Sequence, residues 1–355
     1  MKTERKEGGF SIIEMMITMA IFLVVIGSVY GLLQVGFVDR NRASRQANIL
    51  KNARIALHLI GRDALNAGLS YHRIGGLLPN NAVPRLLNLP LDADTNRDFL
   101  TSIIAGNDIF PNNLKPSVRT DTISFVYRDL SFNGGNTISL TDASVVSSNT
   151  IDLITPSGGA TNAKPFDLYL VESDSSQVVV MVTEVPASNR IRVSTGDPLG
   201  INQSLSGTGS NVSLLRKCNP PTIVDNCTTY VASAKRIFWV AYRVLNDGTL
   251  VRITFGNNTG ASASDQIQQM PIAYNVQDLQ IQYLMDDGRV LDDPIAGPDG
   301  IRGTVDDTPL AMNDVRQINI SITVQSPEVD EQTKAFKTIT LTASFSTRNV
   351  IYDAG

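Results

Sequence analysis

Positions 15–38 contain no charged residue, and this stretch lies close to the start of the chain. As a helix, about 24 residues at 1.5 Å each reach ~36 Å, which is enough to cross a hydrocarbon core of about 30 Å with some tilt. A secretory signal peptide would instead have a shorter apolar segment followed by a small-residue cleavage site, and neither is present. The stretch therefore predicts a membrane-spanning helix.

The charges in front of this helix predict its orientation. Lys2, Arg5 and Lys6 precede the apolar stretch. Basic residues that flank a membrane span stay on the cytoplasmic side. We therefore expect a cytoplasmic N-terminus, with the rest of the chain on the other side of the membrane.

Composition narrows the class of protein. The 355 residues are 42% hydrophobic and 18% charged, which excludes wholesale disorder. A net charge of -4 argues against a surface built mainly for nucleic acid, so no nucleic-acid partner is predicted. Two cysteines and two histidines are too few for zinc fingers or iron–sulfur clusters. Without a G-x-S-x-G motif or a phosphate-binding loop, we expect a protein that is not an enzyme.

Glu14 is a charge inside the apolar segment that begins at Phe10. A lone carboxylate costs on the order of 2.5 to 3.5 kcal/mol at the centre of a membrane helix, and less near its end. Either Glu14 stays hydrated at the membrane surface, or a group of opposite charge is its partner.

The residues around Glu14 resemble a known signal, and this resemblance implies which group is the partner of the Glu14 carboxylate. The sequence Gly8-Gly9-Phe10-Ser11-Ile12-Ile13-Glu14 follows a charged leader and precedes an apolar helix. It resembles the type III signal of type IV prepilins. The resemblance implies that a prepilin peptidase cuts between Gly9 and Phe10 and methylates the new N-terminus at Phe10. It also implies that Glu14 accepts the charge of the methylated amine of a neighbouring subunit, because the two charges neutralise each other best between subunits.

The helix is expected to continue beyond the membrane. Small or apolar residues recur every three or four positions, at Ala43, Ala47, Leu50, Ala53, Leu57, Ile60, Ala64 and Ala67. This spacing predicts one apolar stripe of a helix, with Gly68 as its stop. The other faces carry basic residues that are either solvated or bind phosphate, namely Arg40, Arg42, Arg45, Lys51, Arg54 and Arg62. Segment 56–69 resembles the helix end of PilW-type minor pilins and J-type minor pseudopilins, with their Arg/Asp pair before an Ala-Gly.

Beyond position 121, alternating apolar and polar residues predict β-strands. We expect them at 122–127, 137–140, 167–171, 177–184, 190–194, 235–244, 249–255, 315–324 and 336–345. The clearest hairpin covers 234–255 and turns at Asn246-Asp247-Gly248. Segment 68–119 is rich in Pro, Asn and Gly, which predicts a loop with little regular structure.

These elements predict an α+β fold of the type IV pilin-like kind. A long N-terminal helix, whose first half spans the membrane, precedes a large β-rich globular domain. The expected parts are a cleaved leader (1–9), a transmembrane and assembly helix (10–38), its continuation on the head (39–68) and a periplasmic or extracellular head (69–355).

Two groups of residues in the head are candidate sites. Cys218 and Cys227 lie outside the cytoplasm, where a disulfide is the default, whereas two free thiols would need a reducing compartment. Seven carboxylates gather in positions 286–307, which we call the acidic loop. This loop is either a solvated surface or a calcium site, calcium being the one cofactor considered. The calcium ligands would be Asp292, Asp293, Asp299, Asp306 and Asp307.

Other residues that could bind a metal or a base are interpreted as structural. Asp92, Asp94 and Asp98 begin like a calcium loop, but the turn glycine and the closing Glu are missing. His58 and His72 have no evident partner and are expected to be structural. An aromatic concentration around one strand is expected in the core and on the sheet face rather than on a base-stacking surface; it consists of Tyr230, Phe238, Trp239 and Tyr242.

The resemblance implies a PilW-like minor pilin of a type IV pilus, one that contributes to the start of assembly or to the pilus tip. Its partners would be a prepilin peptidase, other major and minor pilins, the inner-membrane assembly platform and the inner membrane. Before assembly it would cross the inner membrane once, with its head in the periplasm, and later it would lie in the pilus at the cell surface. The alternatives are a J-type minor pseudopilin of a type II secretion system and a pilus-tip adhesin or DNA-uptake subunit.

Overall fold

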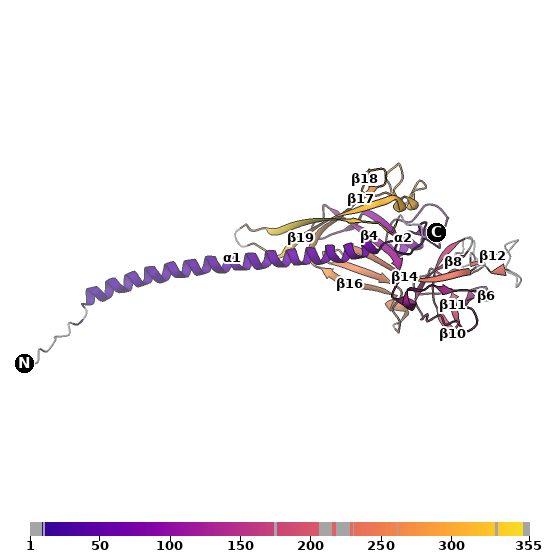
Figure 1. The fold of residues 1–355 in the computed structure, drawn as a ribbon. Coiled ribbons are helices and arrows are strands. Elements are labelled where there is room, and N and C mark those ends of the chain that lie inside the picture. The colour runs from indigo at the N-terminus through magenta and orange to yellow at the C-terminus, as the bar shows by residue number, and fades with distance from the viewer. Residues whose placement is uncertain are drawn as a thin grey trace, which may run out of the picture.

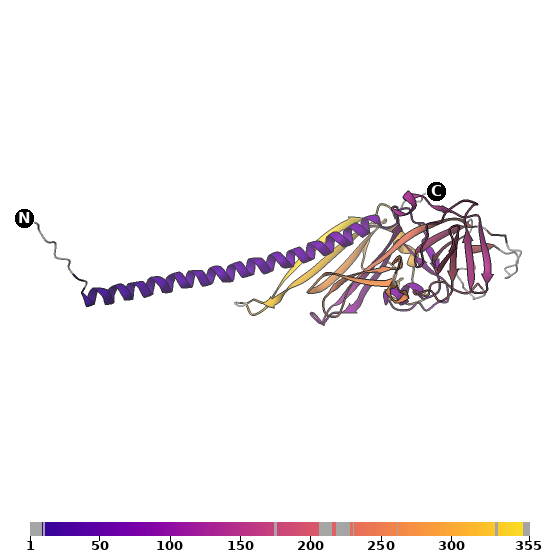
Figure 2. The ribbon, with the colours of Figure 1, turned by 90° about the horizontal axis from the view of Figure 1, so that it is seen from below.

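A long helix and a β-rich head make up the chain. The computed structural model describes residues 9, 11–173, 176–205, 215–217, 228–229, 231–260, 262–330 and 333–350. Helix α1 (Ile12–Asn66) extends alone over its N-terminal half and lies along the head over its C-terminal half (Figure 1, Figure 2). The predicted α+β class is therefore confirmed.

Short elements follow α1. They are β1 (Gly76–Leu78), α2 (Ala82–Leu87), β2 (Asp98–Leu100) and β3 (Ile103–Pro111). The next strands are β4 (Arg119–Arg128), β5 (Ile138–Ser139), β6 (Asp142–Ser147), β7 (Thr150–Ile154), β8 (Leu168–Ser173), β9 (Gln177–Met181), β10 (Glu184–Ala187) and β11 (Arg190–Ser194).

The second half of the head contains the longest strands. They are β12 (Arg216–Lys217), β13 (Thr228–Thr229), β14 (Val231–Val244), β15 (Leu250–Phe255), β16 (Ile267–Ala273), β17 (Val276–Met285), β18 (Val290–Leu291), β19 (Val315–Val329) and β20 (Phe336–Ser346). Short 3₁₀ helices lie at η1 (Phe132–Gly135), η3 (Ala263–Gln266) and η4 (Pro309–Asp314).

These boundaries test the predicted strands. Each one overlaps an observed strand, and the hairpin of β14 and β15 turns where expected, with Gly248 at a φ of 80°. The strand predicted at 177–184 is in fact two, because β9 ends at Met181 and β10 begins at Glu184. The prediction that 68–119 has little regular structure is wrong, since β1, α2, β2 and β3 lie there.

Three sheets of four or more strands form most of the described head. In the described residues, the largest sheet holds ten strands, and β14 is its central member. The first half of β14 pairs with β8, whereas its second half pairs with β4 and β15. A separate sheet has the order β18-β17-β19-β20, and the sheet β10-β11-β7-β6 covers a second core at the end remote from α1 (Figure 1).

The C-terminal half of α1 packs between the ten-stranded sheet and the sheet that contains β19 and β20. It contacts β19 and β20 of one sheet, and β16 and β4 of the other. Its buried residues begin at Ile49, so the predicted stripe is wrong at Ala43 and Ala47, which are exposed. A Cβ on Gly61 would overlap the Phe345 ring, so the close approach of the helix to β20 requires glycine. Helix α1 ends at Asn66, and Gly68 follows with a φ of 79°.

Candidate assembly site

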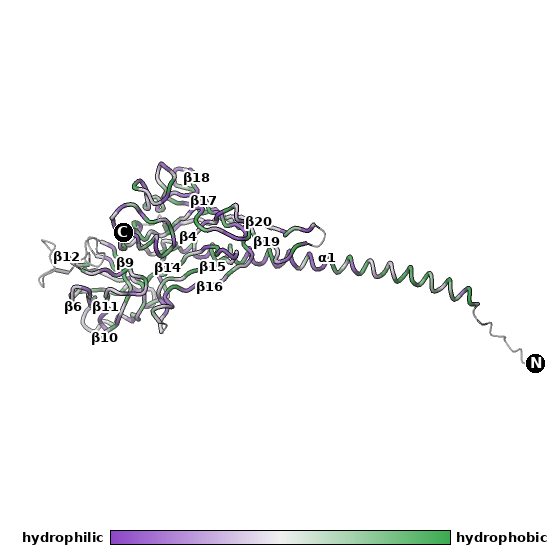
Figure 3. Tube along the Cα trace, turned by 180° about the vertical axis from the view of Figure 1, so that it is seen from behind, coloured by the Kyte–Doolittle hydropathy of each residue, from purple (hydrophilic) through white to green (hydrophobic). Residues whose placement is uncertain are grey.

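The N-terminal half of α1 is uncovered. All residues from 11 to 37 are exposed, and Val38 is the first that the rest of the chain partly covers. Apolar residues predominate in this part, where much of the tube in Figure 3 has the green of hydrophobic residues. The helix is long and apolar enough to cross a membrane. Such a surface is stable only in lipid or among other apolar helices.

Gly9 lies in an open position in front of the helix. It is exposed, and a Cβ added to it would meet no atom within 4 Å. Within the described residues, packing therefore does not require glycine at this position. Phe10, the predicted methylation site, lies outside the described residues.

Glu14 occupies the first turn of α1 and is exposed. Its negative charge complements the positive end of the helix dipole. The Thr18 hydroxyl donates to the Glu14 backbone carbonyl at 2.8 Å, not to the carboxylate. Within the described part of the chain, no hydrogen bond or ion pair reaches this carboxylate. A partner for Glu14 in lipid must therefore come from outside the described residues.

A buried carboxylate, Asp63, fixes the docked half of α1. Its side chain is 0% exposed and accepts hydrogen bonds from three adjacent strands. The Tyr242 hydroxyl donates to Oδ2 at 2.6 Å, and Arg252 Nε donates to the same atom at 2.8 Å. The Tyr127 hydroxyl donates to Oδ1 at 3.2 Å, and the Arg62 guanidinium also contacts this atom.

The phenols of this network stay protonated. Burial, together with the Asp63 charge, raises the pKa of Tyr127 to about 12 and that of Tyr242 still further. Both hydroxyls therefore remain donors, and one buried carboxylate joins α1 to β4, β14 and β15. The sequence offered a signal for this role, since Asp63 is a carboxylate beside the apolar stripe and belongs to the Arg/Asp pair of the resemblance.

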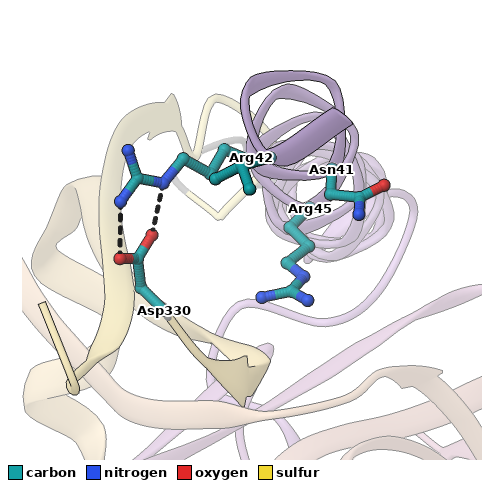
Figure 4. A pocket seen from close by; sticks show the side chains of 5 residues that line it. Asn41, Arg42, Arg45 and Asp330 are labelled. Atoms are coloured by element: carbon teal, nitrogen blue, oxygen red, sulfur yellow. Dashed lines mark hydrogen bonds and ion pairs between the residues drawn. The ribbon is translucent and has the colours of Figure 1, made fainter. Parts of the chain in front are cut away.

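A second contact holds α1 closer to its uncovered apolar half. Arg42 Nε and Nη2 donate to the two Asp330 oxygens at 2.8 and 2.7 Å (Figure 4). Arg45 Nη2 lies 2.8 Å from Glu328 Oε2. Asp330 and Glu328 belong to the β19–β20 hairpin, so neither solvation nor phosphate binding, the two alternatives from the sequence, describes Arg42 and Arg45.

The acidic loop holds its carboxylates separately. Asp293 pairs with Arg302 at 3.0 Å, and both side chains are 11% exposed. Asp299 and Asp307 accept from backbone N–H groups of their own loop, Asp292 accepts from Gln282, and Asp306 accepts from Thr304. In the described ranges, no group of three or more His, Cys, Asp or Glu residues is arranged to hold a metal. Calcium binding by this loop stays a prediction.

Asp98, the last member of the shorter acidic motif, has a structural position. It is 8% exposed and accepts from the backbone N–H groups of Asn81 and Val83, at the start of α2. Burial raises its pKa to about 6, although these two hydrogen bonds oppose the shift. Asp94 accepts from the backbone N–H of Asn96. The motif therefore shapes a turn and a helix start.

The remaining candidates fall into three groups. Cys218, Cys227 and Tyr230 lie outside the described residues. Trp239 and Tyr242 are 0% exposed, as expected for core residues, and the Trp239 indole donates to Ser124 at 2.8 Å. His58 is exposed on α1, and His72 Nδ1 accepts from the backbone N–H of Ile74.

Comparison with known proteins concerns the N-terminus. A family model described as the prokaryotic N-terminal methylation motif matches residues 5–30. No curated protein and no solved structure matches the chain. The chain thus carries a type IV pilin-like prepilin signal. This motif supports a pilin-like or pseudopilin protein, structural rather than enzymatic, which prepilin peptidase processes and which assembles with other pilins.

Proposed function

We propose that this protein is a PilW-like minor pilin of a type IV pilus that contributes to the start of assembly or to the pilus tip. The observation that carries the proposal is the prepilin-type motif on a helix that is uncovered from residue 11 to residue 37. Such a helix is stable in the inner membrane before assembly and among neighbouring helices afterwards. Its other half docks on a large head, which lies in the periplasm and then on the pilus.

The shape of the head supports a position at the fibre end. The second core, under β6, β7, β10 and β11, lies remote from α1 (Figure 1). A subunit inside a fibre has neighbours on every side, whereas an end subunit has one free side. The sheet of β6, β7, β10 and β11, with the core beneath it, is accommodated most easily on that free side.

In this proposal Glu14 selects the incoming or preceding subunit. Its carboxylate lies in the first turn, where the methylated amine of a neighbouring Phe10 would lie close to it. Each charge is costly in lipid by itself, and the two offset each other when the subunits meet. The contact therefore favours assembly over the isolated membrane-anchored state.

Processing is the first test. We expect protein recovered from pili or membranes to begin at a methylated Phe10, and the variant Gly9→Leu to remain unprocessed because the peptidase must accept an extended backbone without a side chain there. Intact-mass measurement and N-terminal sequencing distinguish the two forms. Gly8→Ala is the matched control and is expected to be cut. An assembled wild-type protein that still begins at Met1 would refute the proposal.

The variant Glu14→Gln tests assembly. Neutralising the carboxylate relieves its burial cost in lipid and removes its attraction to a neighbouring amine. We expect normal membrane insertion, with a loss of incorporation into sheared pili and fewer pili per cell, measured by immunoblot and electron microscopy. Glu14→Asp keeps the charge and should restore much of the function. Normal pili together with defective protein secretion would favour the J-type pseudopilin instead.

A further inference from the structure

The β19–β20 hairpin reaches the level at which the apolar part of α1 ends. It extends along α1 beyond the rest of the head, toward the N-terminus of the helix (Figure 1, Figure 2). Val38, Asn41, Arg42, Arg45 and Asp330 line a small hollow between the hairpin and the helix (Figure 4). Val38 is the last residue of the charge-free stretch. When 15–38 spans a membrane, the end of the hairpin therefore lies at its surface.

The end of the hairpin carries two exposed apolar side chains. Val329 and Phe336 are paired across the hairpin and are 41% and 46% exposed. The Lys337 ammonium donates to Gln46 of α1 at 2.8 Å. Because side chains alternate along a strand, Phe336 lies on the face directed away from the helix. Neither apolar side chain is accounted for by the docking of α1.

The charges near this pair suit a phospholipid surface. The carboxylates of Asp330 and Glu328 are paired with Arg42 and Arg45, so their repulsion from anionic lipid is offset. Arg40 and Lys334 are exposed at the same end, against one exposed described carboxylate on this turn of α1, that of Asp39. Basic side chains beside an apolar contact are attracted to lipid phosphates.

We propose that the end of the hairpin binds the headgroup layer of the membrane that α1 spans. Phe336 and Val329 insert among the headgroups, and Lys334 and Arg40 face the lipid phosphates. This inference rests on the membrane anchoring in the proposed function. A helix in the bilayer and a hairpin on its surface give two points of attachment, which fix the direction of the head before the subunit leaves the membrane.

Tryptophan fluorescence provides the test, because the chain contains one Trp, and Trp239 is 0% exposed in the head. The full-length variant Phe336→Trp is placed in phosphatidylethanolamine–phosphatidylglycerol vesicles with and without brominated acyl chains. We expect the emission of the added Trp to shift to shorter wavelength and to be quenched by the brominated lipid, while the wild-type emission is unchanged.

Two further variants separate the outcomes. Leu33→Trp, in the apolar part of α1, reports anchoring, and Val305→Trp, 84% exposed in the acidic loop, reports the head surface. Quenching at 33 and 336 but not at 305 supports the inference. Quenching at 33 alone overturns it and leaves the anchoring intact, as does a spectral shift at 336 without quenching, which would indicate a protein neighbour. Equal quenching at 305 and 336 also overturns it, and quenching at none of the three positions overturns the anchoring itself.

Discussion

Replacing Asp63 by Ala is expected to lower the free energy of unfolding by about 3 to 5 kcal/mol, because it leaves a buried cation without its partner. The Arg252 side chain is 16% exposed and lies 2.8 Å from the Asp63 carboxylate. The Tyr242 hydroxyl loses the same acceptor. Since Asp63 is the point at which three strands bond to α1, we expect the helix to separate from the head before the sheets unfold.

Chemical unfolding of the full chain in detergent measures this effect, with Trp239 as the fluorescent reporter. Hydrogen exchange of residues 49–66 reports the separation of the helix. Arg62→Ala is the matched control, because its side chain is next in sequence but 53% exposed, and exposed ion pairs contribute about 1 kcal/mol or less. Equal losses in the two variants would show that Asp63 is not the anchor described here.

Local sequence patterns were sufficient to predict the helices and strands that have a strong periodicity of their own. The absence of charge over 15–38 identifies the long helix, because a helix is the structure in which one continuous apolar segment satisfies its own backbone groups in lipid. The hairpin of β19 and β20 was predictable because its strands alternate over ten or more residues. Strand β17 carries the same signal, with Leu279, Ile281, Tyr283 and Met285 buried alternately, although it was not predicted.

Segment 68–119 was not predictable in this way because its elements depend on distant partners. Strand β1 has three residues and is held by β2 and by Val178 of β9. Helix α2 has six residues and begins after Asn81, which has a positive φ of 59°. The composition correctly indicates turns in this segment, but it does not reveal which strands pair with one another to form the short elements.

The residues of the candidate site also differ in whether a local sequence pattern predicts them. The N-terminal motif is local in sequence, because it contains Gly9, Phe10 and Glu14 within a few positions, and it can be recognised from the sequence alone. The contact between Arg42 and Asp330 joins residues 288 positions apart, so no local pattern contains it. Asp63 lies between these cases, because a carboxylate beside an apolar stripe indicates a buried partner without naming it.

Asp121 is expected to make the head less stable as the pH rises from about 4 to about 7. It is 2% exposed, and its two oxygens accept from the backbone N–H groups of Asp108 at 2.8 Å and Ile281 at 2.6 Å. Asp121 lies on β4 of the ten-stranded sheet, whereas Ile281 lies on β17 of the sheet β18-β17-β19-β20. This carboxylate therefore joins the two sheets. Burial raises its pKa to about 7, the two hydrogen bonds oppose this shift, and the charges of Asp108 and Asp278 add to it.

The sign of the effect follows from these pKa values. In the unfolded chain an Asp ionises near pH 3.9, whereas Asp121 in the folded head holds its proton up to about pH 7. Its contribution to stability is therefore complete below about pH 4, and it is lost as the pH rises through 7, by on the order of 4 kcal/mol. Unfolding of the wild type and of Asp121→Asn should be compared at pH values from 4 to 8. Because Asn does not titrate, other groups cancel in the difference, and the wild type should lose its advantage over the variant as the pH rises; a difference that is constant, or that grows with pH, would contradict a protonated Asp121 in the folded head.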